Sequence, residues 1–155
     1  MTLMKKALLS LLPLAVLPAL AQNAAIENLP EAKGKAVVEK VCSVCHEPTA
    51  VGKYRKSKED WQAVIDDMVT RGADATDQEF DTVIDYLAKC FGPAVKINTI
   101  AAGDLEKQLE LSNKEAAAIV QYRQSNGAFK ELADLKKVPG LDYSKIEPVR
   151  YRITF

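Results

Sequence analysis

The chain has 155 residues, and its 21 Lys and Arg side chains balance 21 Asp and Glu side chains, so its formal net charge is zero. A neutral chain attracts a polyanion only weakly, which argues against a bulk nucleic-acid partner. The charge is nevertheless uneven. Residues 22–94 hold nine basic and 13 acidic side chains, whereas residues 95–155 hold ten basic and eight acidic ones. This asymmetry predicts two small domains with different surfaces.

The N-terminus has the features of an export signal. Lys5 and Lys6 precede an apolar stretch at residues 7–20, and Ala19-Leu20-Ala21 is a small-x-small cleavage site. The apolar run is short for a membrane span. We therefore expect residues 1–21 to be a signal peptide and the mature protein to lie in the periplasm. The alternative is an N-terminal anchor that is not cleaved.

The pentapeptide Cys42-Ser43-Val44-Cys45-His46 has the C-x-x-C-H spacing of covalent haem attachment. Two intervening residues let both thiols reach one edge of a macrocycle, and the next histidine can then ligate the iron. The sequence therefore predicts one covalent haem c, held by Cys42 and Cys45, with His46 as an iron ligand.

The elements around this motif are predicted to be helices. One helix begins at Pro30 and leads to the motif, because proline suits a first helical turn. Capping boxes at residues 57–60 and 76–79 begin two more, and Gly92-Pro93 ends the last. Three helices bury little core, and haem would supply the missing apolar mass. Residues 22–93 are thus expected to be a small class I-like cytochrome c domain.

Met68 is the candidate for the other axial iron ligand. Beyond the signal peptide the chain has one histidine and one methionine, and Met68 lies on an apolar helix face with Trp61. His/Met ligation suits electron transfer. Two alternatives stay open: Met68 fills core space, or the distal site is open and the haem senses a gas or catalyses a reaction. Cys90 is left over, either as a buried apolar residue or as a reactive thiol.

The segment from Cys42 to Pro93 resembles the haem-bearing region of quinohaemoprotein amine dehydrogenases and related dehydrogenase-associated cytochromes. The matching residues are Cys42, Cys45, His46, Arg55, Ser57, Trp61, Met68, Arg71, Gly72 and Ala73. The resemblance implies electron transfer and a methionine ligand. It also implies that Arg55 pairs with a haem propionate, the alternative being a solvated loop charge. Trp61 is expected to pack against the haem.

The remaining residues, 94–155, are also predicted to be helical, after a linker at residues 93–95. They resemble the helix-hairpin-helix module of the ComEA-like competence family, whose members bind DNA without sequence preference. The matching residues are Ile97, Asn98, Thr99, Leu105, Ala116, Ala118, Ile119, Tyr122, Arg123, Phe129, Lys130, Asp134, Leu135, Val138, Pro139, Gly140 and Ile146. A further capping box at residues 112–115 begins a helix in this segment. Residues 109–123 and 138–150 form a weak internal repeat. The expected fold is therefore all-α, a cytochrome c domain followed by a helix-hairpin-helix domain.

The hairpin turns of this module depart from the family pattern of Gly-hydrophobic-Gly. Glycine lets backbone N–H groups approach a phosphate closely. The first turn, Glu110-Leu111-Ser112, has no glycine, and the second, Gly140-Leu141-Asp142, keeps one. Lys136 and Lys137 flank the second turn, so these two lysines and Gly140 are the candidate nucleic-acid contacts.

Two functions follow from these patterns. The leading hypothesis is a non-enzymatic, exported monohaem cytochrome that carries single electrons to or from a periplasmic dehydrogenase or oxidase, with the second domain as a docking scaffold. The alternative is a periplasmic DNA-binding protein without sequence preference that carries an attached haem domain.

Overall fold

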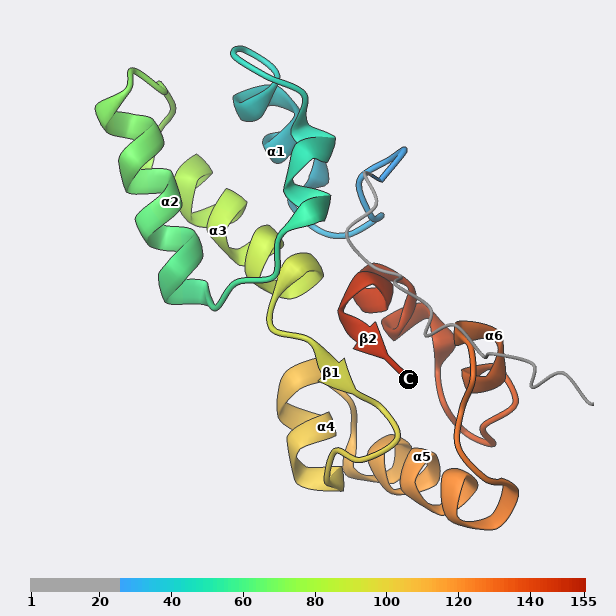
Figure 1. Ribbon diagram of the computed structural model, residues 1–155. Coiled ribbons are helices and arrows are strands. Elements are labelled where there is room, and N and C mark those ends of the chain that lie inside the picture. Colours follow the sequence, from blue (N-terminus) through green and yellow to red (C-terminus); the bar gives the residue numbers. More distant parts are fainter. Residues whose placement is uncertain (1–25) are drawn as a thin grey trace, which may run out of the picture.

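A computed structural model describes residues 26–155, and the predicted signal peptide at residues 1–21 lies outside this range. The described chain is mostly helical, as expected (Figure 1). Its helices are α1 (Lys35–Cys42), the 3-10 helix η1 (Pro48–Lys53), α2 (Lys58–Thr70), α3 (Asp77–Phe91), α4 (Ala102–Leu109), α5 (Asn113–Asn126), α6 (Leu132–Leu135), and the 3-10 helices η2 (Tyr143–Lys145) and η3 (Glu147–Arg152). Two short strands, β1 (Val95–Lys96) and β2 (Ile153–Thr154), pair in parallel. No helix within residues 26–155 is long and apolar enough to cross a membrane.

Three helix starts confirm the capping boxes read from the sequence. At Ser57, Thr76 and Ser112 the hydroxyl accepts the N–H of the third helical residue, and the carboxylate of that residue accepts the N–H of the cap. These contacts span three residues only, so they form wherever the sequence supplies both partners.

α1 begins at Lys35 rather than at Pro30, for a tertiary reason. Gly34, at φ +99°, turns the chain into the helix, and a Cβ on it would lie 3.1 Å from Cγ2 of Thr82 on α3. Only glycine permits this backbone conformation so close to α3. Pro30 is buried before the turn, and its carbonyl accepts a hydrogen bond from the Tyr86 hydroxyl at 2.8 Å.

In the first half α3 lies between α1 and α2 (Figure 1). The buried core there consists of Ile26, Leu29, Val38, Trp61, Ile65, Val83, Ile84, Tyr86, Leu87, Cys90 and Phe91. Cys90 has no exposed surface, and burial raises the pKa of its thiol to about 11. Of the two alternatives for Cys90, the structure therefore supports the buried apolar residue.

The second half has a separate core, made by Val95, Ile97, Leu105, Leu109, Leu111, Ala116, Ile119, Phe129, Leu135, Val138, Ile146, Val149 and Ile153. Val95, expected in the linker, is fully buried there and pairs with Ile153. The N–H of Ile97 donates to the Thr154 carbonyl at 3.0 Å, so β1 and β2 join the beginning and end of this half.

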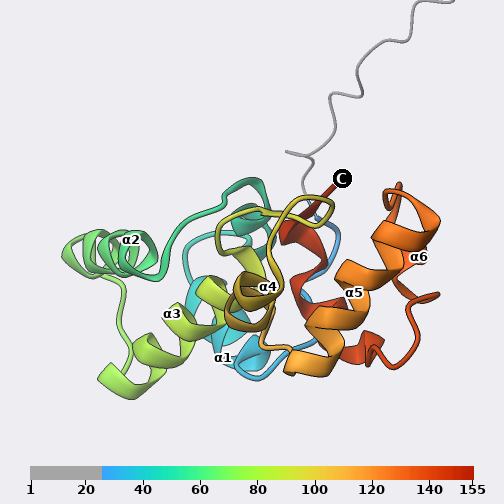
Figure 2. The same cartoon turned by 90° about the horizontal axis from the view of Figure 1, so that it is seen from below.

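The two halves are fastened together at the C-terminal end of α3. The buried Arg152 guanidinium donates to the carbonyls of Lys89 at 3.1 Å and Pro93 at 3.2 Å. The rings of Phe91 and Tyr151 stack with centroids 6.0 Å apart. Seen from below, α2 and α6 lie at opposite ends of the molecule (Figure 2).

Candidate functional site

The C-x-x-C-H motif forms a tight turn after α1. The backbone N–H groups of Cys45 and His46 both donate to the Cys42 carbonyl at 3.3 Å, which continues helical geometry through the motif. Residues spaced i, i+3 and i+4 share one face in that geometry. Cys42 is half-buried, and burial raises the pKa of its thiol, whereas Cys45 and His46 are exposed.

The residues of this turn fit the chemistry of covalent haem attachment. Nδ1 of His46 lies 3.3 Å from the Glu47 carbonyl oxygen. A proton on Nδ1 would leave the Nε2 lone pair for a metal. Two thiols separated by two residues, followed by an imidazole with such a lone pair, form the donor set that the motif requires. Within residues 26–155 no three His, Cys, Asp or Glu side chains gather closely enough to hold a metal ion by themselves.

The other residues predicted for haem binding have protein partners. Trp61 is 2% exposed and its indole N–H donates to the Phe91 carbonyl at 3.3 Å, so it belongs to the protein core. Arg55 donates to the carbonyls of Gly52, Tyr54 and Tyr151. It is thus a bridge between the halves rather than a solvated loop charge. Met68 is half-buried near the end of α2.

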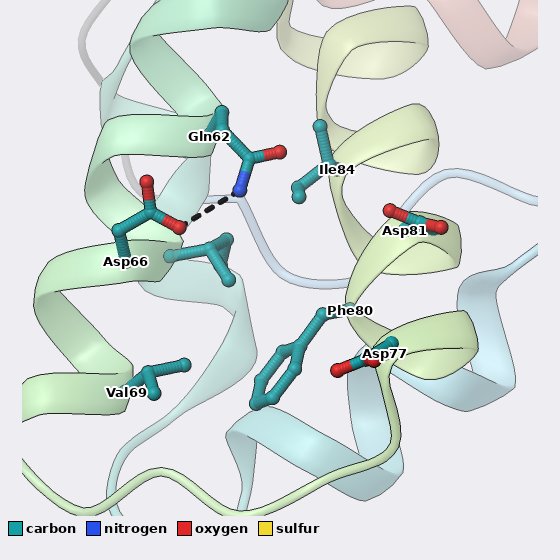
Figure 3. A pocket seen from close by; sticks show the side chains of 8 residues that line it. Gln62, Asp66, Val69, Asp77, Phe80, Asp81 and Ile84 are labelled. Atoms are coloured by element: carbon teal, nitrogen blue, oxygen red, sulfur yellow. Dashed lines mark hydrogen bonds between the residues drawn. The ribbon is translucent and has the colours of Figure 1, made fainter.

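A pocket of about 400 Å³ opens between α2 and α3 (Figure 3). Its lining is Gln62, Ile65, Asp66, Val69, Asp77, Phe80, Asp81 and Ile84. Its carboxylates come from both helices, and the Gln62 amide donates to Asp66 at 2.8 Å. None of the predicted haem-binding residues lines it. The carboxylates of this pocket would repel a phosphate.

The first hairpin turn, between α4 and α5, is held by side chains. Glu110 adopts φ +54°, a left-handed conformation that glycine would adopt without strain. Its carboxylate accepts a hydrogen bond from the Lys89 ammonium at 2.5 Å, across the junction with the first half. Glu110 therefore points toward Lys89, not toward the second hairpin.

The second hairpin turn is more open. Gly140, at φ +79°, is exposed, and a Cβ on it would meet nothing within 4 Å. A phosphate could approach the backbone there. Lys136 is exposed, with its ammonium 4.8 Å from the Tyr143 ring centroid, and Lys137 is exposed and bonded to Asp134 at 2.7 Å. All three predicted contacts are thus exposed within five consecutive residues of the chain.

The residues that tie the two hairpins together were not predicted from the sequence. The Glu115 carboxylate, on the first turn of α5, contacts the second hairpin through Asp142 and Lys145. The internal repeat contained a clue, because Glu115 and Lys145 each follow the first residue of their hairpin turn by five positions.

Comparisons with known proteins agree with this architecture. Residues 92–154 match the helix-hairpin-helix motif family. An uncharacterized protein of Haemophilus influenzae is 36% identical over 88 residues, which cover 52% of this chain and 79% of that protein. The chain belongs to one family with that protein.

A second relative specifies the kind of module. ComE operon protein 1 of Bacillus subtilis is 33% identical over 63 residues, or 41% of this chain and 31% of that protein. This chain carries a ComEA-like helix-hairpin-helix module. The module also resembles part of endonuclease/exonuclease/phosphatase family domain-containing protein 1 of Rattus norvegicus, 33% identical over 61 residues, 39% of this chain and 11% of that protein. No solved structure matches the chain.

These matches correct the leading functional hypothesis. The expectation of a single-electron carrier, with the module as a docking scaffold, is wrong, because the matched family and the ComE relative support the DNA-binding alternative instead. No match supports a cytochrome, an iron centre, or a dehydrogenase or oxidase partner. The physical reason is that C-x-x-C-H is a five-residue local pattern, whereas the module match extends over residues 92–154. The net charge of the whole chain misled as well, because it averages an acidic first half with a second half that holds ten basic and eight acidic side chains.

Proposed function

We propose that this protein binds DNA without sequence preference through the helix-hairpin-helix module of its second half. The observation that carries the proposal is the exposed second hairpin, where a Cβ on Gly140 would meet nothing within 4 Å and where Lys136 and Lys137, four and three residues earlier, are also exposed. Backbone N–H groups and lysines contact phosphates, which carry no sequence information. Such a protein binds without catalysing a reaction.

We place this activity outside the cytoplasm, since residues 1–21 have the pattern of a secretory signal peptide. The second half has a small excess of basic side chains, which suits a polyanion. The pocket between α2 and α3 is lined by carboxylates and does not suit one. DNA is the proposed partner.

Changing Lys136 and Lys137 together to glutamate tests the proposal. We expect the affinity of the full chain for a duplex of about 20 base pairs to fall at least tenfold at low salt, because the change replaces attraction to phosphates with repulsion. The slope of log affinity against log salt should become shallower by about two, at about 0.9 per lost phosphate contact. Fluorescence anisotropy with two duplexes of unrelated sequence measures both quantities.

The matched control is Lys33→Glu with Lys53→Glu, which makes the same charge change at exposed sites of the first half. This control should retain most of the affinity. A wild-type chain that leaves both duplexes unbound at low salt would overturn the proposal.

The proposal includes one covalent haem on the first half, bound through Cys42 and Cys45 with His46 as a ligand and Met68 as the candidate second ligand. Haem held by these residues would supply an iron porphyrin. Expressed with cytochrome c maturation machinery, the wild-type chain should retain haem after denaturation, and the Cys42→Ala, Cys45→Ala double variant should lose it. Haem stain after denaturing electrophoresis and the pyridine haemochrome spectrum give the measurement. A wild-type chain without haem would refute the assignment, and Cys90→Ala is the control.

A further inference from the structure

One carboxylate is buried between the two hairpin turns of the module. Glu115 is 6% exposed. Its Oε2 accepts hydrogen bonds from the Ser112 N–H at 2.8 Å, the Ser112 hydroxyl at 2.6 Å and the Lys145 ammonium at 2.7 Å. Its Oε1 accepts one from the Asp142 N–H at 3.3 Å. The carboxylate therefore has donors from both hairpins.

The donors are related by the internal repeat. Ser112 and Asp142 are the third residues of their hairpin turns and lie 30 positions apart, as do Glu115 and Lys145. The same backbone N–H of each hairpin thus reaches the same carboxylate. Glu115 occupies the point where the two repeats meet.

This donor set is of the kind that holds a phosphate. Two backbone N–H groups, a hydroxyl and an ammonium converge on the oxygens of one anion, next to the N-terminus of α5, where the helix dipole favours negative charge. The hydrogen bonds from Lys145 and Ser112 lower the pKa of Glu115 to about 2, so the carboxylate is charged at neutral pH. Ser112 and Asp142 are themselves exposed, so the site borders solvent.

We propose that Glu115 sets the DNA affinity of the module by competing, as an internal anion, with a DNA phosphate for the hairpin donors. This inference rests on the proposed function. While Glu115 holds the amides and the Lys145 ammonium, the module binds DNA through the outer lysines alone. Loss of the Glu115 charge releases Lys145 and both hairpin amides to phosphate.

The test is Glu115→Gln in the full chain, which keeps the side-chain shape and removes the charge. We expect its affinity for the same duplex to rise about five- to tenfold at low salt, with a salt slope steeper by about one, the equivalent of one added phosphate contact. The matched control is Glu147→Gln, which makes the same charge change at an exposed carboxylate of the module. It should change the affinity less than twofold.

Lys145→Gln is the second variant, and it should weaken binding, because it leaves the Glu115 carboxylate without its neutralising cation and that carboxylate then repels phosphate. A purely structural role for the pair would make both changes weaken binding together, and that result would overturn the inference. If thermal melting shows that Glu115→Gln does not fold, unchanged or tighter binding by Lys145→Gln overturns it instead. If the wild type binds the duplex and Glu115→Gln does not bind it more tightly, this inference alone is refuted. Absence of binding by every variant refutes the proposed function with it.

Discussion

Replacement of Trp61 by alanine is expected to lower the free energy of unfolding by about 3–5 kcal/mol, the largest effect of any single change considered for this chain. Trp61 is 2% exposed in the first core, and its indole N–H donates to the Phe91 carbonyl. Alanine would leave a large cavity and remove the indole hydrogen bond to the Phe91 carbonyl, which would keep only the bond from the Lys56 N–H at 3.0 Å.

Urea unfolding followed by far-ultraviolet circular dichroism measures this loss, because the chain has one tryptophan and the variant loses its fluorescence. Val69→Ala is the control on the same helix. Val69 is 44% exposed, so its truncation should change the stability by less than about 0.5 kcal/mol. A loss below about 1 kcal/mol for the Trp61 variant would mean that the side chain is not part of the core.

Arg152→Met is expected to cost about 2–4 kcal/mol and to uncouple the two halves. The guanidinium is 6% exposed, and burial lowers the pKa of Arg152, but the group stays charged at neutral pH. Its two hydrogen bonds go to the carbonyls of Lys89 and Pro93 at the end of α3. A hydrogen bond to a charged group contributes about 1.5–3 kcal/mol, and methionine would leave both carbonyls without that donor.

Two probes reveal the uncoupling. Trp61 fluorescence reports the first half, and amide hydrogen exchange at Leu105, Ile119 and Leu135 reports the core of the second. We expect coincident unfolding of both halves in the wild type and separate transitions in Arg152→Met. Arg71→Met is the control, because Arg71 lies just after α2, pairs with Asp67 of that helix and is exposed. Coincident transitions at the wild-type midpoint in the variant would contradict the assigned role.

Some residues of the candidate functional site could be predicted from the sequence, and others could not. Lys136, Lys137 and Gly140 were recognised from the sequence because they follow one another along a single turn. Glu115 was missed because its partners, Asp142 and Lys145, are 27 and 30 residues away. Arg55 was assigned to a haem propionate, yet one of its bonds goes to the Tyr151 carbonyl, 96 residues along the chain.

The sequence by itself determined the elements whose causes are local. It predicted a mostly helical chain, the helix starts at Ser57, Thr76 and Ser112, and the resemblance of residues 94–155 to a helix-hairpin-helix module. A capping box spans three residues, so little chain entropy opposes it, and its partners can be read directly.

Only the tertiary structure decided where distant groups meet. The parallel pairing of β1 with β2, the Arg152 bonds to the end of α3 and the Glu115 carboxylate between two hairpins each join segments 27 to 63 residues apart. No local pattern encodes such a contact, because it forms only after both cores have packed and positioned its partners. The start of α1 follows the same rule, since Gly34 is required by the approach of α3 and not by its own neighbours.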